Sequence, residues 1–488
     1  MTKLYRKNQE GYRAVKHRMW FGGALFALLC ALPAMADNRF IVRSTLGSGA
    51  LGQFCVLQSC TVVGAVDGTL NQVFLLTTPS TIDSTTFLNL LSNTPGILDA
   101  ELDQLISLVG GLNTVTSVPP GLTDNLPVDY FGATVWNGYA NQTASNIVHV
   151  RDAQDAFHVA GTGIVADIDT GVDPDHPALR NALVPGYDFT RNQPGGSKMT
   201  DFTSPAPPSC ANCQPAIVNQ STAAVLDQST AAVLDGNVQY AAFGHGTMVM
   251  GIIHLVAPRA RLLPLKAFRS DGTGYLSDVL RAVYYAVQNN ANVINMSFDT
   301  TTNSKELKHA LHYANHLNVI CVASAGNDSS PAPPNFVYPA ALQGYAMGVA
   351  STSDMDTRSW FSNFGNAIVW VAAPGEAIVT TYPFNTYAVG WGTSFSAPFV
   401  AGGAALMRNL RTDINESLAA SAMAHAQFVG PSMGNGRLDL LMSLAALSAG
   451  DDPPESDVSA TSSSMKIGVG ENKSLASPLQ LRVGSNTW

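Results

Sequence analysis

The chain has 488 residues, 46% hydrophobic and 12% charged, which predicts a largely globular protein rather than a disordered one. Its formal net charge is -9, and the first 36 residues carry six Lys or Arg against one acid, so the remainder is more acidic than the whole. Because no basic tract lies outside that first segment, nucleic acid is excluded as a partner.

Residues 1–36 have the pattern of an export signal. A basic region ends at Arg18, an apolar stretch follows from Met19 to Leu32, and Ala34-Met35-Ala36 provides a cleavage site before Asp37. An uncleaved membrane anchor is the alternative, but the apolar stretch is shorter than the roughly 20 residues that span a bilayer. We therefore predict a secreted protein, extracellular or periplasmic, with no stable membrane insertion after signal removal.

Residues 37–110 predict a small α+β domain without a catalytic constellation. Two apolar runs flank Asp67-Gly68 as in a hairpin, and the close pair Cys55 and Cys60 is able to form a disulfide in an oxidising compartment. The expected elements are strands at 40–42, 62–66, 72–76 and up to 102, and a helix at 84–91.

Residues 111–149 are interpreted as a linker and a lead-in segment, because 109–129 is rich in Gly, Pro and Thr. Residues 188–240 are rich in Pro, Ser, Thr, Asn and Gln and contain an octapeptide at 220–227 that is repeated at 228–235. This segment, with the pair Cys210 and Cys213, is interpreted as an exposed insertion. A flexible tail is expected over 448–488.

Between these segments, residues 150–447 predict an α/β domain. A buried strand that begins at Gly163 is expected to place Asp169 at the edge of a sheet. Helices then alternate with strands along the chain. Such alternation predicts a mostly parallel sheet covered by helices on both faces, with ligands at the carboxyl ends of the strands. The helices are expected at 152–157, 245–255, 277–288 with a Ser277 cap and 305–317, and the strands at 262–266, 292–296, 319–323, 346–350 and 368–371; Cys321 is expected to be a buried thiol.

Three polar residues of this domain form a candidate catalytic set. Ser394 precedes an apolar run with helical spacing, which places its hydroxyl at a helix N-terminus where developing negative charge is favoured. His245 is flanked by Gly244 and Gly246, and Asp169 ends the buried strand. Together they provide a nucleophile, a base and a residue that orients the base.

On these motifs the chain resembles the subtilisin-like serine peptidases, the subtilase family. The resemblance rests on Asp-Thr-Gly at 169–171, His-Gly-Thr at 245–247 and Gly-Thr-Ser at 392–394, in the order Asp, His, Ser, and covers about residues 150–447. It implies the three-layer fold of that family and a serine endopeptidase in which Ser394 attacks, His245 transfers the proton and Asp169 fixes the imidazole tautomer. Asp167 and Asp173 are rivals for the carboxylate, and they are interpreted as solvated or turn-capping residues.

Further segments extend the resemblance. Asn327, at the end of Ala323-Ser324-Ala325-Gly326-Asn327, matches the side-chain donor to the oxyanion, although a Gly-Asn turn is the structural alternative. The substrate-flanking segments are implied to be Gly272, Thr273 and Gly274 on one side and Met296, Ser297 and Phe298 on the other. Residues 37–110 then resemble an inhibitory propeptide, which makes the protein a zymogen.

Three residues depart from the family pattern. Asp299 replaces a glycine after the Ser-Phe pair, Phe395 replaces a methionine, and Met248 replaces a second histidine. A calcium loop is not carried over, and the triplet His309, His312 and His316 is interpreted as a solvated helix face, so we predict no metal and no cofactor.

The predicted partners are a protein or peptide substrate and the N-terminal domain as intramolecular inhibitor. A narrow-specificity processing protease remains an alternative, as does a non-catalytic peptide-binding protein on the same fold.

Overall fold

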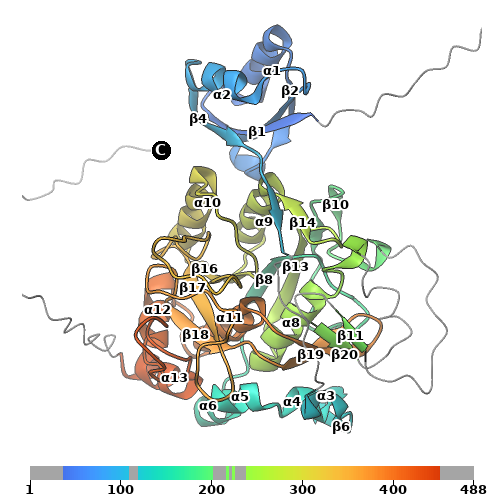
Figure 1. Cartoon of the computed structure of the whole chain (residues 1–488), viewed down its shortest axis with the longest axis vertical. Helices are drawn as coiled ribbons and strands as arrows, with labels where there is room; N and C mark the ends of the chain where they lie inside the picture. Colours follow the sequence, from blue (N-terminus) through green and yellow to red (C-terminus); the bar gives the residue numbers. More distant parts are fainter. Residues whose placement is uncertain (1–36, 109–118, 202–215, 219–222, 226–237, 451–488) are drawn as a thin grey trace, which may run out of the picture. The chain divides into compact units, whose positions relative to one another are not determined.

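The computed structural model describes residues 37–108, 119–201, 216–218, 223–225 and 238–450 (Figure 1). It divides into two compact units, of which the first comprises residues up to 103 without 66–68. The predicted signal peptide, the pair Cys210 and Cys213, and residues 451–488 of the predicted tail lie outside the described residues. Within the described ranges, no helix is both long and apolar enough to cross a bilayer.

The first unit is an α+β domain with the element order β-α-β-β-α-β. Its antiparallel sheet has the strand order β2-β3-β1-β4, and its core is formed by apolar side chains such as Phe40, Phe74 and Phe87. The predicted disulfide between Cys55 and Cys60 is present. The elements are β1 (Asn38–Ser44), α1 (Gly47–Gln58), β2 (Thr61–Ala65), β3 (Val73–Thr78), α2 (Ser84–Ser92) and β4 (Ile97–Leu102).

The second unit is built on an eight-stranded sheet in the order β10-β9-β13-β8-β15-β16-β17-β18. All strands from β9 to β18 pair in parallel, and only the edge strand β10 is antiparallel, which confirms the predicted mostly parallel sheet. The strands are β8 (Ile164–Asp169), β9 (Tyr187–Asp188), β10 (Gln193–Pro194), β13 (Arg261–Lys266), β15 (Val293–Met296), β16 (Ile320–Ser324), β17 (Met347–Thr352) and β18 (Val371–Pro374).

Helices cover both faces of this sheet. Helices α8 (His245–Val256) and α11 (Thr393–Leu410) pack together on one face, and α9 (Leu276–Gln288) and α10 (Lys305–His316) pack on the other (Figure 1). Helix α11 is buried on every side from Thr393 to Met407, as expected for a helix through the core. The predicted Ser277 cap is wrong, because α9 begins one residue earlier after Tyr275 and has no side-chain cap.

Residues 120–149, in the segment predicted as a linker and a lead-in, form helices and strands of the second unit. The hydroxyls of Tyr130 and Tyr139 are buried and donate to the carbonyls of Leu255 and Gly251 in α8, the latter at 2.7 Å. These contacts attach the segment to helix α8, which begins at His245. The elements are α3 (Pro120–Thr123), β6 (Pro127–Tyr130), β7 (Ala133–Trp136), α4 (Asn137–Ala140), α5 (Thr143–Ile147) and α6 (Val150–Phe157).

The predicted exposed insertion over 188–240 is also only partly correct. Asp188, Phe189 and Lys198 are buried, because residues 187–198 pair with or pack against β13 and the turn after β8. Two short strands, β11 (Ala216–Val218) and β12 (Ala223–Val225), extend a second antiparallel sheet through β20 (Thr386–Gly390), which pairs with β19 (Ile378–Tyr382). Strand β12 falls within the first copy of the octapeptide.

Two helices, α12 (Glu416–Met423) and α13 (Leu440–Ala449), end the described part of the second unit, and each begins at a side-chain cap. Cys321 on β16 is a buried free thiol, as predicted.

Candidate active site

Asp169 and His245 are held together by two adjoining element ends. Asp169 is the last residue of β8, and His245 is the first residue of α8. The His245 Nδ1 atom lies 2.7 Å from Asp169 Oδ2 and 2.9 Å from Oδ1. Gly246 has to be a glycine, because a Cβ there would come 2.3 Å from the carbonyl oxygen of Gly171. The contact fixes the imidazole through Nδ1 and leaves Nε2 for the reacting group.

Ser394 is the second residue of α11, as its sequence pattern predicts. Its hydroxyl donates to the carbonyl oxygen of Ser297 at 3.2 Å, and the Ser297 hydroxyl donates to the Ser394 carbonyl oxygen at 2.9 Å. The buried Nε2 of His245 has no hydrogen-bond partner. The hydroxyl of Ser394 and the Nε2 atom of His245 are therefore not hydrogen-bonded to each other in this structure, and catalytic hydrogen bonds often form only when substrate binds.

Asn327 is fixed beside the start of α11 by its amide oxygen. Asn327 Oδ1 accepts from the Thr393 backbone N–H at 2.8 Å and from the Thr393 hydroxyl at 3.0 Å, and that hydroxyl in turn accepts from Gly326 N–H at 3.1 Å. These contacts fix the orientation of the amide, and its Nδ2 group is the donor of the side chain. The residue before Thr393 is Gly392, whose φ of 152° is a conformation that favours glycine. A donor is thus placed next to the predicted nucleophile.

The two rival carboxylates have other roles. Asp167 is buried, not solvated; its Oδ1 accepts from Asn295 Nδ2 at 2.9 Å, and burial and the Asp169 charge raise its pKa well above the ordinary value. Asp173 is a turn-capping residue, as predicted, since its carboxylate accepts from the backbone N–H groups of Asp175 and Phe384. Neither carboxylate is hydrogen-bonded to the imidazole of His245.

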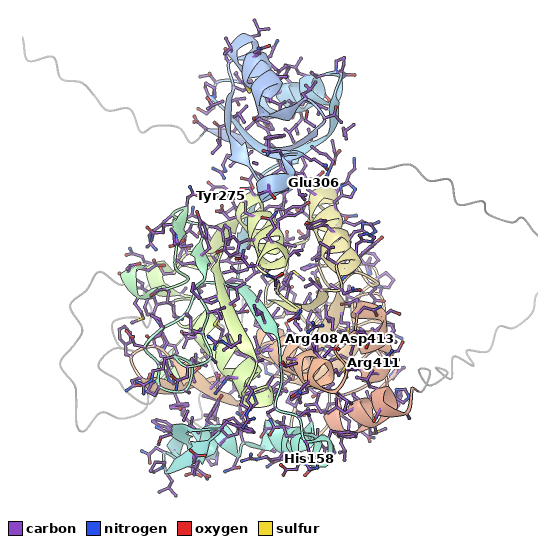
Figure 2. The ribbon with its side chains drawn as sticks, turned by 180° about the vertical axis from the view of Figure 1, so that it is seen from behind. His158, Tyr275, Glu306, Arg408, Arg411 and Asp413 are labelled. Atoms are coloured by element: carbon purple, nitrogen blue, oxygen red, sulfur yellow. A yellow bond between two sulfur atoms is a disulfide. The ribbon has the colours of Figure 1, made fainter. Side chains whose placement is uncertain are left out.

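The predicted substrate-flanking segments lie on elements of the same unit. β14 (Thr273–Tyr275) pairs antiparallel with β5 (Leu105–Ser107), and the backbone N–H of Leu108 donates to the Gly272 carbonyl at 2.9 Å. Tyr275 at the end of β14 is labelled in Figure 2. Met296 ends β15, and Ser297 and Phe298 follow it toward Ser394.

Comparison with known proteins identifies the family to which the chain belongs. The profile of the Subtilase family matches residues 161–451, which is more than half of the chain. Thermitase of Thermoactinomyces vulgaris is 34% identical over 261 residues, which cover 52% of this chain and 78% of thermitase. The chain belongs to the subtilase family. It is a subtilisin-like serine endopeptidase, and therefore a hydrolase.

Other relatives are matched over shorter shares. The thermophilic serine proteinase of Bacillus sp. (strain AK1) is 32% identical over 253 residues, 50% of this subtilase and 51% of the relative. Subtilisin DY of Bacillus licheniformis is 37% identical over 174 residues, 34% of this subtilase and 63% of subtilisin DY. The chain thus spans about half of the first of these two relatives and less than two thirds of the second.

Lys198 lies close enough to Asp169 to interact with its charge, and this residue was not identified from the sequence. Lys198 is completely buried, its Nζ has no hydrogen-bond partner, and it lies 5.5 Å from the centre of the Phe243 ring. Burial lowers its pKa to about 7, against the opposing effects of the Asp169 and Asp173 carboxylates. Lys198 belongs to the segment that composition marks as an exposed insertion, so no local signal identified it.

In the described part of the subtilase, no group of three or more His, Cys, Asp and Glu side chains is arranged to hold a metal ion. His309 contacts Glu306 at 3.5 Å, and its ring is half exposed.

Replacement of Asn327 by leucine is expected to lower kcat by about 10²–10³ with little change in KM, because the donor acts on charge that develops only in the transition state. That magnitude comes from subtilisin, a member of the same family. Steady-state kinetics on a peptide substrate measure the effect. A change confined to KM would instead indicate a role in substrate binding, and equal stability of the two proteins controls for misfolding.

Asp299 lies beside the segment that contains Gly326 and Asn327. It follows Ser297 and Phe298, and its Oδ2 would lie 3.0 Å from a Cβ placed on Gly326, which precedes Asn327. Its carboxyl is thus between the two segments that border Ser394. Burial, with a smaller effect of the Asp328 charge, raises its pKa to about 7.

The charge of Asp299 predicts a pH-dependent preference. Above a pKa of about 7 the carboxylate is ionised and attracts a basic side chain; below it, the neutral acid does not. We expect the ratio of kcat/KM for substrates with Lys and Leu before the cleaved bond to rise about three- to fourfold from pH 6 to pH 8, since an ion pair of about 1 kcal/mol forms as the ionised fraction of Asp299 increases. Both substrates depend in the same way on the ionisation of the catalytic groups, so this dependence drops out of the ratio. In Asp299→Asn the ratio should stay flat, and a rise that persists in this variant contradicts the assignment.

Proposed function

We propose that this subtilase hydrolyses peptide bonds through an acyl-enzyme on Ser394. The observation that supports it most is the two-atom contact of Asp169 with His245, beside a serine at the start of a buried helix. His245 removes the Ser394 hydroxyl proton as the oxygen attacks the peptide carbonyl, and Asp169 keeps the proton of Nδ1 in place. Asn327 donates to the oxyanion of the tetrahedral intermediate.

Collapse of that intermediate breaks the peptide C–N bond. His245 gives the proton to the leaving amine, and the acyl group stays on Ser394. Water then attacks the ester with His245 as base, and the peptide acid leaves while the proton returns to Ser394. The test is digestion of a peptide library by the mature protein. New amino and carboxyl termini support the proposal, and an intact library rejects it.

We also propose that the protein is exported and made as a zymogen. Residues 1–36 supply the signal peptide, and the first unit supplies the inhibitor. The support is local to the second unit: residues 104–108 add an antiparallel strand to β14, as an extended peptide would. Ile106 pairs with Gly274 and is buried, so this strand has the register and the side-chain burial of a bound peptide.

The maturation cleavage is expected just after Leu108. The strand that pairs with β14, as an extended substrate would, ends at Ser107, so we expect the cleaved bond among the residues that follow Leu108 in the sequence. Mass spectrometry of the secreted, active protein should find a new amino terminus within those residues. The Ser394→Ala chain should keep its first unit, because self-cleavage needs the nucleophile. Active protein that still begins at Asp37 would exclude removal of this domain.

A narrow-specificity processing protease is the alternative that one observation favours, namely Asp299 beside the segment that contains Gly326 and Asn327. The same library distinguishes it from a broad endopeptidase: cleavage at only a few related sequences indicates a processing enzyme. A non-catalytic peptide-binding protein would retain library peptides without cutting them.

A further inference from the structure

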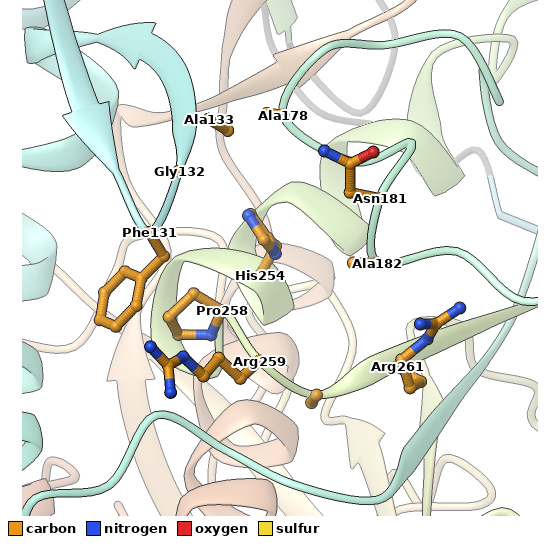
Figure 3. A pocket seen from close by; sticks show the side chains of 11 residues that line it. Phe131, Gly132, Ala133, Ala178, Asn181, Ala182, His254, Pro258, Arg259 and Arg261 are labelled. Carbon is orange, nitrogen blue, oxygen red and sulfur yellow. The ribbon is translucent and has the colours of Figure 1, made fainter.

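A pocket of about 250 Å³ lies at the C-terminal end of α8 (Figure 3). Three segments form its walls: the turn between β6 and β7 at Phe131, the loop at Asn181, and the residues that follow α8. None of its described lining residues is acidic, although the chain as a whole has a net charge of -9. The pocket is therefore a positive site on an acidic protein, and the triad residues do not line it.

His254 lies in the middle of this pocket; its ring contacts the edge of Tyr130, with 6.3 Å between the ring centres, but it has no hydrogen-bond partner. Its side chain is only 5% exposed, yet neither ring nitrogen has a hydrogen bond. Burial, with a smaller effect of His176, lowers its pKa to about 4, so the ring is neutral at pH 7. A neutral imidazole offers one N–H donor. A buried donor without a partner is costly, so the site is suited to a ligand that accepts from it.

Two arginines complete the donor set. Arg259 and Arg261 lie on either side of His254 in Figure 3, and both are exposed. Arg259 has no side-chain hydrogen bond or ion pair among the described residues. Arg261 uses one terminal nitrogen to donate to the Leu183 carbonyl at 3.0 Å, which leaves its other N–H groups available. Neither charge is neutralised by a carboxylate in the pocket lining.

We propose that this pocket binds a small oxyanion of the phosphate type. Guanidinium groups match the paired oxygens of phosphate, and His254 and Asn181 add neutral donors from two other segments. The ligand would connect the β6–β7 hairpin, the 178–182 loop and the end of α8. Because it binds the folded chain, it would raise thermal stability. The inference does not depend on the proposed function.

The test uses the full-length chain with Ser394→Ala, which cannot digest itself. Calorimetric titration with inorganic phosphate, against sodium chloride of equal ionic strength, should give saturable binding of one phosphate per chain. Arg259→Gln and Arg261→Gln should each weaken it about tenfold, the loss of a charge-assisted contact. Arg180→Gln, an exposed arginine outside the pocket lining, is the matched control and should bind as the parent does.

A second readout separates binding from the general effect of salt. Phosphate stabilises many proteins without saturation, by exclusion from their surface. A site predicts a melting temperature that rises and then levels off, and that loses this saturable part in Arg259→Gln. Acetate, the carboxylate probe, should bind more weakly than phosphate. No saturable phosphate binding, equal binding by the pocket variants, or stronger binding of acetate would each overturn the proposal.

Discussion

Replacement of Ser394 by alanine is expected to lower kcat for a peptide substrate by about 10⁶-fold, the loss found for the nucleophile of subtilisin, a member of the same family. Without the hydroxyl, His245 and Asp169 have no group to activate, and only the oxyanion donor and substrate binding remain. Adding His245→Ala should cost little more, because the two residues act as a unit. Steady-state and single-turnover hydrolysis of one peptide measure both effects.

Ser396 is the matched control for this substitution. It lies two residues further along α11, is fully buried, and its hydroxyl has no hydrogen-bond partner. Ser396→Ala removes the same oxygen from the same helix, so activity should stay close to that of the parent. Equal losses in the two variants would mean that packing of α11, and not the hydroxyl of Ser394, limits the rate.

Replacement of Asp169 by asparagine is expected to lower kcat by about 10⁴-fold with an intact fold, the loss found for the corresponding change in a serine protease triad. Asparagine donates where the carboxylate accepts, so the imidazole takes the tautomer that cannot accept the serine proton at Nε2. A pH series of kcat/KM measures it, and recovery of activity at high pH is compatible with this cause.

Asp167→Asn provides the comparison on the same strand. Asp167 is buried beside Asp169, its pKa is raised well above the ordinary value by burial and by that neighbour, and its Oδ1 accepts from Asn295. Asparagine keeps the size of the side chain and the oxygen that accepts from Asn295, so activity should change little. A larger loss in Asp167→Asn than in Asp169→Asn would reverse the assignment of the catalytic carboxylate.

Most of the parallel sheet could be predicted, and the candidate catalytic residues could be singled out, because their sequence signals are local. The close approach of the Gly171 carbonyl requires glycine at 246, and a φ of 152° favours glycine at 392, so these glycines mark the two positions in the sequence. Helix α8 and strand β13 were predicted to within a residue, since apolar periodicity follows directly from burial on one or both faces.

What could not be predicted depends on contacts between distant segments. Residues 120–129 have the composition of a linker, but the segment 120–149 is held in the second unit by contacts with distant elements, such as the hydrogen bonds of Tyr130 and Tyr139 to α8. Lys198 likewise gains its position near Asp169 from the pairing of Val172 with Ser197. Helix α1 was missed because a glycine-rich stretch has low helix propensity, and packing of Leu51 and Cys55 outweighs it.

The most direct test of the central claim is covalent labelling of the mature, inhibitor-free protein with a fluorophosphonate. The reagent reacts with a serine only when a base and an oxyanion site activate it. We predict one label per chain, located on Ser394 by peptide mapping, with labelling retained in Ser396→Ala and absent in Ser394→Ala. No label on the correctly folded mature protein, or a label on another residue, would contradict the assignment of Ser394 as the nucleophile.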